Sequence, residues 1–400
     1  MFRGQTQRSS SVVRSRGVIS LAAMVALMVP ISLAPQVPGV PDRYLAVSEL
    51  TIGDADGPVA LTRVGQITVQ GPRVYVSQPA EQRIRVFSAD SGELLDEWGS
   101  RGDGPGEFQR LFWMGGTGDG LVAVDSQLHR ITHFAFDGTV TRTLGFRLPP
   151  PDPPFVFAGW IMPTLDGNLV VFGDVSLRAE GSSGEHPWVL ASPDGEVLDA
   201  LPPLQTRDRS IVIRGDGGSS TSLNRPIHRG DRFAMASDGS LFVQAGDAEG
   251  RGLSLSIYDV VDRRSHVVDT GIPPVDVDPT LGDSIMRPIR DALTREQRVP
   301  PGVSSGELDQ AFAAPEWVPA VDEMFVTAEG EVWMRVPNLV DGSTHDVWNV
   351  VGPDATYRAV VEVPAGLVLM ARDADLVWGF RLDEVFGFVM IERLRLEPVN

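Results

Sequence analysis

The chain has 400 residues, of which 42% are hydrophobic, enough for a sizeable core in one large domain or in two or three smaller ones. Its formal net charge is −19 and all its basic residues are arginines, so it lacks the strongly basic face that nucleic-acid binding requires. It has no cysteine, which excludes disulfides, thiolate metal sites, a cysteine nucleophile and a lipid-modified cysteine.

The first 34 residues have the pattern of an export signal. Several arginines and no acidic residue precede residues 18–29 (VISLAAMVALMV), which are almost wholly apolar. This pattern is typical of a secretion signal peptide, because the apolar stretch is short for a membrane span. Pro35 follows the best cleavage triplet, so an uncleaved membrane tether through residues 18–34 is an alternative. A cleaved signal peptide and an uncleaved tether both predict an extracytoplasmic protein (periplasmic, secreted or membrane-anchored facing outward). Residues 35–43 are expected to form a linker.

Two turn-and-strand markers recur along the rest of the chain. The first is a small-residue or Asp-Gly turn before an apolar strand, and it occurs six times, for example at Gly120, Gly167 and Gly239. The second is another such turn between two further strands, as at Gly138 and Gly195. Turns of this kind are strong hairpin signals, and a repeat of about 40–50 residues is typical of a four-stranded propeller blade. The pattern predicts an all-β, six-bladed β-propeller, with blades at 64–100, 108–147, 155–204, 227–272, 317–363 and 366–397.

The last of these cycles supplies only three clear strands. Residues 44–52 (YLAVSELTI) precede the first cycle and have no other partner. We expect them to form the outer strand of the sixth blade, because this closure removes an exposed sheet edge. The domain thus extends over residues 44–400.

Two loops are long, at residues 207–225 and at about 273–315. The second predicts a small helical insertion between blades four and five. Ile285, Ile289 and Leu293 share one helical face there, with Pro288 inside that span as a kink or a helix start. A second short helix over residues 306–314 is expected, capped by Ser304 or Ser305. Such an insertion could be a lid or an ornament.

The connector between the first two blades carries a family pattern. It reads GxxGxGPGEF and follows a strand with the sequence RIRVF, and it comprises Gly99, Gly102, Gly104, Pro105, Gly106, Glu107 and Phe108. This phrase resembles the NHL-type six-bladed β-propellers, most closely the uncharacterised secreted bacterial members. The resemblance, with the six cycles, covers residues 44–397 and implies the fold. It implies no single activity, because such propellers serve as protein-binding platforms, RNA binders, lactonases and lyases.

In a propeller, the connectors between blades and the loops between second and third strands surround the central channel on one face. We expect ligand binding there by the exposed polar residues of these segments, namely Arg83, Arg101, Asp103, Glu107, His129 and Arg251. An alternative is a divalent metal, Ca²⁺ or Zn²⁺, held by His186, His345 and Asp247. Polar loop residues are more often solvated or fix the loops, so no cofactor is expected.

The sequence thus favours a non-enzymatic extracytoplasmic module that binds a protein, a peptide or a carbohydrate on its loop face. The alternative is a metal-dependent hydrolase or lyase of the lactonase type that uses His186, His345 and channel carboxylates. A nucleic-acid partner is not expected. No nucleophile elbow, phosphate-binding loop or HExxH motif is present. A surface module held by an uncleaved anchor is a third possibility.

Overall fold

The computed structural model describes residues 41–53, 59–149, 158–173, 185–205, 209–247, 249–339, 343–354, 356–382 and 388–399. The export signal or anchor expected in residues 1–34 lies outside these ranges. The linker expected over residues 35–43 ends earlier, because a strand begins at Asp42. Among the described residues, no helix is both long and apolar enough to span a membrane.

Four separate four-stranded antiparallel sheets follow one another along the chain, each with its strands in chain order. They contain the strands of the first four expected blades. The Asp-Gly turns stand where they were expected, and Gly167 and Gly239 adopt positive φ angles of 83° and 76° in them. The strands are β2 (Ile67–Gln70), β3 (Arg73–Gln78), β4 (Arg83–Ser88) and β5 (Leu94–Trp98); β6 (Leu111–Thr117), β7 (Gly120–Asp125), β8 (Arg130–Ala135) and β9 (Val140–Gly145); β10 (Ala158–Pro163), β11 (Leu169–Gly173), β12 (Glu185–Ala191) and β13 (Val197–Gln205); and β16 (Arg232–Met235), β17 (Leu241–Gly246), β18 (Ser254–Asp259) and β19 (Arg264–Asp269).

Eight further strands form one sheet in the order β22-β23-β24-β25-β1-β28-β27-β26. Strand β1 lies between the two halves of this sheet. It pairs in antiparallel fashion with β28 and, through its first residues, in parallel with β25. The expected pairing of residues 44–52 with the last strand of the chain is therefore present. The strands are β1 (Asp42–Ile52), β22 (Glu323–Val326), β23 (Val332–Arg335), β24 (His345–Val351), β25 (Tyr357–Pro364), β26 (Val368–Asp373), β27 (Leu376–Leu382) and β28 (Val389–Pro398).

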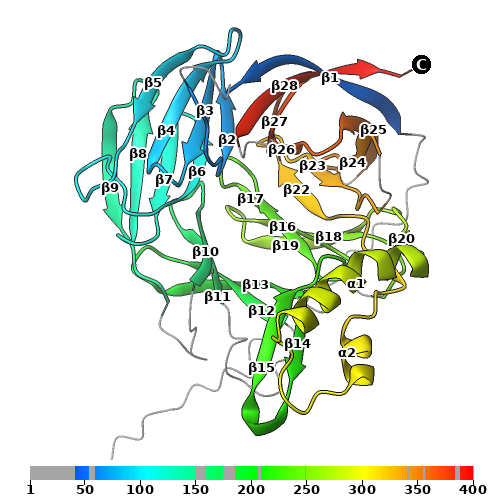
Figure 1. Cartoon of the computed structure of the whole chain (residues 1–400). Helices are drawn as coiled ribbons and strands as arrows, with labels where there is room; N and C mark the ends of the chain where they lie inside the picture. The colour runs from blue at the N-terminus through cyan, green and yellow to red at the C-terminus, as the bar shows by residue number, and fades with distance from the viewer. Residues whose placement is uncertain are drawn as a thin grey trace, which may run out of the picture. The chain divides into compact units, whose positions relative to one another are not determined.

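Each pair of neighbouring sheets shares a hydrophobic core, and the series of cores returns from the last strands to the first sheet. Trp378 and Ile391 of the eight-stranded sheet pack with Val76 and Phe87 of the first, for example. First strands of neighbouring sheets contact one another, as β2 does with β6 and β26, and β22 does with β16 and β26. The sheets therefore stand around a common centre that the first strands face, as in a β-propeller, with β5 and β9 on the outside (Figure 1).

The two long loops form one small insertion. Residues expected as an irregular loop contain the hairpin β14 (Ser210–Arg214) and β15 (Ser220–Asn224), and the second loop contains α1 (Pro279–Arg295), α2 (Ser305–Ala311) and the short pair β20 (Val275–Asp276) and β21 (Trp317–Val318). Their apolar residues share a core of their own, in which Ile211 and Ile213 of the hairpin meet Met286, Leu293 and Phe312. Figure 1 shows these elements gathered at one side of the sheets.

The two helices begin through local signals. Asp278 caps α1 with its carboxylate, which accepts hydrogen bonds from the amides of Thr280 and Leu281. Ser304 caps α2, and Glu307 completes a reciprocal capping box. Pro288 lies inside α1, which continues through it to Arg295, so the proline is not a helix start.

Candidate functional site

The second strands end, and the third strands begin, at the same end of the sheets as the connectors between sheets. Strand register shows why: the first residue of β16, Arg232, lies opposite Ala245 near the end of β17, and Ser254 at the start of β18 lies opposite Asp269 at the end of β19. We call this end the loop face, and the loop-face ends of the first strands the inner rim. The β14–β15 hairpin and the two helices also leave the sheets from the loop face, because they lie within connectors.

Three aromatic side chains form a row on the inner rim. Phe112 lies on β6, Trp160 on β10 and Phe233 on β16, the first strands of three consecutive sheets. The ring centroids of Phe112 and Trp160 are 5.6 Å apart, and those of Trp160 and Phe233 are 5.5 Å apart in an edge-to-face arrangement. A β10 side chain can touch both flanking sheets only from the inner edge of its own sheet. Trp160 is 40% exposed there, whereas Trp188 behind it is fully buried.

The aromatic row is supported from behind by a buried aromatic cluster. Trp188 lies 4.6 Å from Phe233 and 4.7 Å from Phe242, measured between ring centroids. Phe172 also packs on Trp188, with 4.6 Å between ring centroids. Because these rings fill the space between two sheets, Phe233 and Trp160 are held in place and present a fixed apolar surface.

Other partly exposed side chains of the first strands are mainly apolar. They include Val69 on β2, Met324 on β22 and Met370 on β26. Methionine side chains are flexible and polarizable, so they adapt to the shape of an apolar partner and contact aromatic rings favourably. The inner rim therefore has the character of an apolar recognition surface.

A charged cluster adjoins the aromatic row on the side of β22. The isolated bridge between Ala236 and Val326 sets β16 and β22 parallel and in step, which places Phe233 level with Glu323. Arg335 donates from Nε and Nη2 to the two carboxylate oxygens of Asp322, at 2.8 and 3.1 Å, and lies 3.1 Å from Oε1 of Glu323. Burial raises the pKa of Glu323. This cluster gives the otherwise apolar rim one polar end.

Half-buried arginines bridge main-chain carbonyls at the start of the fourth sheet and within the insertion. Arg232 donates to the carbonyl oxygens of Asp322 (2.6 Å) and Gly230 (2.9 Å), and burial lowers its pKa to about 10. Arg225 donates to the carbonyls of Ala311 and Ala313 at the end of α2. Main-chain carbonyls at a helix C-terminus favour such a cation.

His228 lies among these arginines and is held neutral. Its Nδ1 accepts a hydrogen bond of 3.1 Å from the amide of Gly230. Burial, together with the charges of Arg232, Arg209 and Arg225, lowers the pKa of His228 to about 3. His228 lies in the segment between β15 and β16.

We expect folding stability to fall in acid because of His228. Its pKa in the folded chain lies below the ordinary value near 6.5, so between these values the unfolded chain binds the extra proton. The loss should begin below about pH 6.5 and reach about 1–2 kcal/mol at pH 5 after allowance for partial exposure. Denaturant unfolding at pH 7, 6 and 5 measures this loss of unfolding free energy. The variant His228→Asn should lack this part of the dependence of stability on pH. His266→Asn on the exposed strand β19 is the matched control, and an equal slope in the wild type and in the His228 variant would contradict the expectation.

Most of the connector residues expected to bind a ligand are used within the connector. Glu107 accepts a hydrogen bond of 2.7 Å from the amide of Gly104, and Asp103 accepts one of 2.8 Å from Gln109. Arg130 donates to the carbonyls of Asp103 and Glu107. Arg101 is exposed, and the described residues include no hydrogen-bond partner for its side chain. The connector is therefore shaped by its own polar groups, with Arg101 as its accessible side chain.

The other three expected binding residues are dispersed over the loop face. Arg83 pairs with Glu97 at 2.8 Å in an ion network on the first sheet. His129 has a positive φ of 48° and stacks on Phe146, with 5.4 Å between ring centroids. Arg251 pairs with Glu249, and its side chain is 80% exposed. No contact among the described residues joins these three residues to one another.

The described residues do not bring the expected metal ligands together. Asp247 is buried, and its two oxygens accept hydrogen bonds from the amides of Glu249, Gly250, Arg251 and Gly252, so it shapes the β17–β18 loop. Nδ1 of His345 lies 3.0 Å from the hydroxyl of Thr344. The side chain of His186 lies outside the described part. Within that part, no three histidine or acidic side chains are grouped as a metal site.

None of the residues of the aromatic row is among those that the sequence analysis singles out. A signal is nevertheless present: an aromatic residue precedes a methionine by two positions in LFWM, GWIM and RFAM, which contain Phe112, Trp160 and Phe233. These phrases are the first strands of their sheets. The turn markers of the repeats precede the second strands, so this recurrence lies outside the turn pattern.

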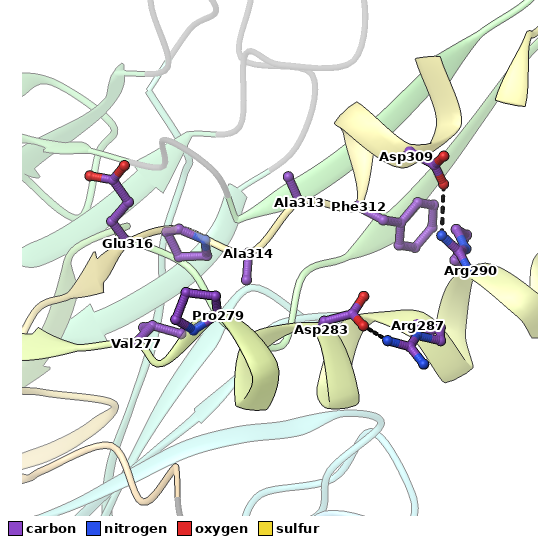
Figure 2. A pocket seen from close by; sticks show the side chains of 11 residues that line it. Val277, Pro279, Asp283, Arg287, Arg290, Asp309, Phe312, Ala313, Ala314 and Glu316 are labelled. Carbon is purple, nitrogen blue, oxygen red and sulfur yellow. Dashed lines mark hydrogen bonds and ion pairs between the residues drawn. The ribbon is translucent and has the colours of Figure 1, made fainter. Parts of the chain in front are cut away.

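A groove of about 710 Å³ lies on the insertion, between α1 and the segment that follows α2. Figure 2 shows Val277 and Pro279 near one end with Glu316, and two ion pairs toward the other. These pairs are Asp283 with Arg287, and Arg290 with Asp309 at 2.7 Å. Since each charge here has an opposite partner, this end of the groove carries little net charge.

No protein-family model matches the chain, and no curated protein sequence matches it. Solved structures with a similar arrangement include three β-propeller proteins. The first is a Bacteroides fragilis protein thought to be exported, at 11% identity and a TM-score of 0.43, with 90% of this chain and 99% of that one covered. The second is virginiamycin B lyase from Staphylococcus aureus, at 11% identity and a TM-score of 0.37, with 87% of this chain and 99% of that one covered. The third is a calcium-binding protein, regucalcin, from Agrobacterium tumefaciens, at 10% identity and a TM-score of 0.37, with 90% of this chain and 98% of that one covered. At this distance they carry no argument about activity, and the propeller assignment depends on the sheet order and the shared cores.

Proposed function

We propose that this chain is an exported, six-bladed β-propeller of the NHL type that binds a protein, a peptide or a carbohydrate at the inner rim of its loop face. The six-blade count is supported by the eight-stranded sheet, which divides at the parallel pairing of β1 with β25 into two four-stranded antiparallel halves. Export is supported by the basic and apolar pattern of residues 1–34. The NHL assignment depends on the glycine-rich connector at residues 99–108.

The aromatic row is the observation that carries the binding function. Phe112, Trp160 and Phe233 come from three sheets, yet their rings meet at one point of the rim. Trp160 leaves 40% of its surface exposed, and Phe233, on which it packs, is held by the buried rings of Trp188 and Phe242. Large exposed aromatic surface on a rigid scaffold is typical of binding sites, where tryptophan contributes strongly to affinity. No described contact favours the alternative of a metal-dependent hydrolase.

Replacement of Trp160 by alanine should weaken binding at least about tenfold, the effect of losing one anchoring aromatic contact. The measurement is binding of purified wild type and variant to glycan and peptide arrays, followed by titration of each ligand found. Leu165→Ala is the matched control: Leu165 is 51% exposed in the β10–β11 turn, at the other end of the same strand. Arg101→Ala and Arg251→Ala test the outer loop face. Ligands that bind the Trp160, Arg101 and Arg251 variants as tightly as the wild type would show that the loop face is not the site.

A further inference from the structure

We infer that the groove on the insertion binds an extended peptide segment in which a lysine or an arginine lies between apolar residues. This is a second site, separate from the inner rim, and it does not depend on the binding function proposed above. Three features of the groove carry the inference: an apolar floor, a free carboxylate at one end and a main chain with unused hydrogen-bonding groups.

The floor of the groove is apolar. Val277 and Phe312 are 6% and 4% exposed, and Ala314 and Pro315 line the groove with them. The volume of about 710 Å³ lies within the range of about 300–1,000 Å³ that is typical of ligand sites. Such a floor can hold apolar side chains and also the aliphatic stem of a basic side chain.

One end of the groove has a carboxylate without a partner. Glu316 is exposed, and the described residues include no hydrogen bond or ion pair to its side chain. By contrast, the acidic side chains toward the other end pair with arginines (Figure 2). The segment from β20 to β21 contains eight acidic residues and four arginines, so its net charge also favours a cation. A basic side chain whose stem lies along Val277 and Pro279 can direct its charged end to Glu316.

The main chain beside the floor has unused hydrogen-bonding groups, which favours a peptide over a small cation. Residues 313–316 lead from α2 to β21 and belong to no helix or strand. Neither the amide nor the carbonyl of Ala314 forms a hydrogen bond among the described residues. An extended peptide can offer both an acceptor and a donor to one such residue, as an added strand does.

Contacts behind the groove hold its two sides together. Gly282 of α1 lies so close to Ala314 that a Cβ at Gly282 would stand 2.5 Å from the Cβ of Ala314. The amide of Val277 donates to the carbonyl of Glu316 at 2.9 Å, and Arg225 donates to the carbonyls of the residues on either side of Phe312. Because the groove is already formed, less conformational entropy is lost when a peptide docks.

The test is an array of pentapeptides Gly-Xaa-Arg-Xaa-Gly, in which each Xaa is leucine, valine, proline or phenylalanine. Two comparison sets have lysine or glutamate in place of the arginine. We expect the purified protein to bind members of the arginine and lysine sets and none of the glutamate set. Fluorescence polarisation then measures the dissociation constants of the tightest peptides.

Two variants test the groove itself. Glu316→Gln should weaken these peptides roughly threefold to fivefold, the scale of one exposed ion pair, and should reduce the loss of affinity on adding salt. Ala313→Trp, at an exposed position that lines the groove, should abolish binding because the indole occupies the site. Glu329→Gln is the matched control, because Glu329 is exposed in the β22–β23 turn at the opposite end of the sheets.

Peptide affinities that are equal in the wild type, in Glu316→Gln and in Ala313→Trp would overturn the inference, as would an array without any bound arginine or lysine peptide. N-acetyl-arginine amide that binds as tightly as the pentapeptides would overturn it in favour of a small cation. A concentration-dependent dimer that Ala313→Trp abolishes would overturn it in favour of a second copy of the chain. Trp160→Ala should leave peptide binding unchanged. If only Trp160→Ala weakens the peptides, they bind at the inner rim, and the inference fails while the proposed function stands.

Discussion

A chain that lacks residues 42–52 should not form a stable monomer. Strand β1 pairs with β28 from Tyr44 to Ile52, and its removal would leave β28 as a long unpaired edge. The deletion would also remove Ala46 and Ile52, which are 2% and 3% exposed, from two of the hydrophobic cores. We expect a loss of more than about 5 kcal/mol, comparable with the whole stability of many domains. Size-exclusion chromatography and circular dichroism of the truncated chain measure the outcome.

A circular permutant is the matched control for this deletion. Tyr44 lies opposite Pro398, and the amide of Val399 donates to the carbonyl of Arg43 at 2.9 Å, so the end of β28 adjoins the start of β1. A short turn from Val399 to Asp42 would therefore convert the two strands into a hairpin. With residues 42–52 moved to the end and the chain starting at Val59, we expect a folded monomer. A truncated chain that melts like the full one, or a permutant that aggregates like the truncated one, would refute the closing role of β1.

Replacement of Phe108 by alanine should destabilise the protein by about 4 kcal/mol, within the range for deleting a buried aromatic side chain. Phe108 is fully buried, and its ring centroid lies 6.2 Å from that of Phe134 in the core between the first two sheets. It also covers Gly99, which has a φ of 84° and where an added Cβ would stand 2.7 Å from the Phe108 ring. The connector thus depends on this ring for its conformation, and denaturant unfolding measures the loss.

Arg101→Ala is the control for Phe108→Ala within the same connector. Arg101 is exposed and has no side-chain hydrogen bond among the described residues, so its replacement should change stability by less than about 0.5 kcal/mol. A similar loss in both variants would mean that the charged side chain also shapes the connector. The two results together separate the structural part of RGDGPGEF from the part available for contact.

The polar candidates on the loop face show why sequence patterns find loops more easily than sites. Asp247 was a reasonable metal ligand by residue type and position, yet its carboxylate accepts hydrogen bonds from four main-chain amides. Asp125 has the same role at the end of β7, where it accepts hydrogen bonds from the amides of Gln109, Gln127 and Leu128, among others. A carboxylate at the end of a second strand can satisfy the amides of the loop that follows. Residue type alone does not distinguish that use from ligand binding.

The sequence by itself determined the features that depend on neighbours along the chain. Asp-Gly turns, apolar strands and helix caps such as Ser304 act over a few residues, so the strands of the first four sheets, both helices and the connector could be predicted. The pairing of residues 44–52 with the last strand was predictable too, since each was the only partner left for the other.

The tertiary structure alone decided what comes together from distant positions. It joined the hairpin at residues 210–224 to the helices of the later loop, because Ile211 and Ile213 bury their side chains against Met286 and Leu293. It also brought Phe112, Trp160 and Phe233 into one row, although 121 positions separate the first from the last. Such contacts depend on the radial packing of the sheets, which places equivalent positions of first strands side by side at the inner rim. No short stretch of sequence contains that geometry, so the fold could be predicted while the candidate site required the structure.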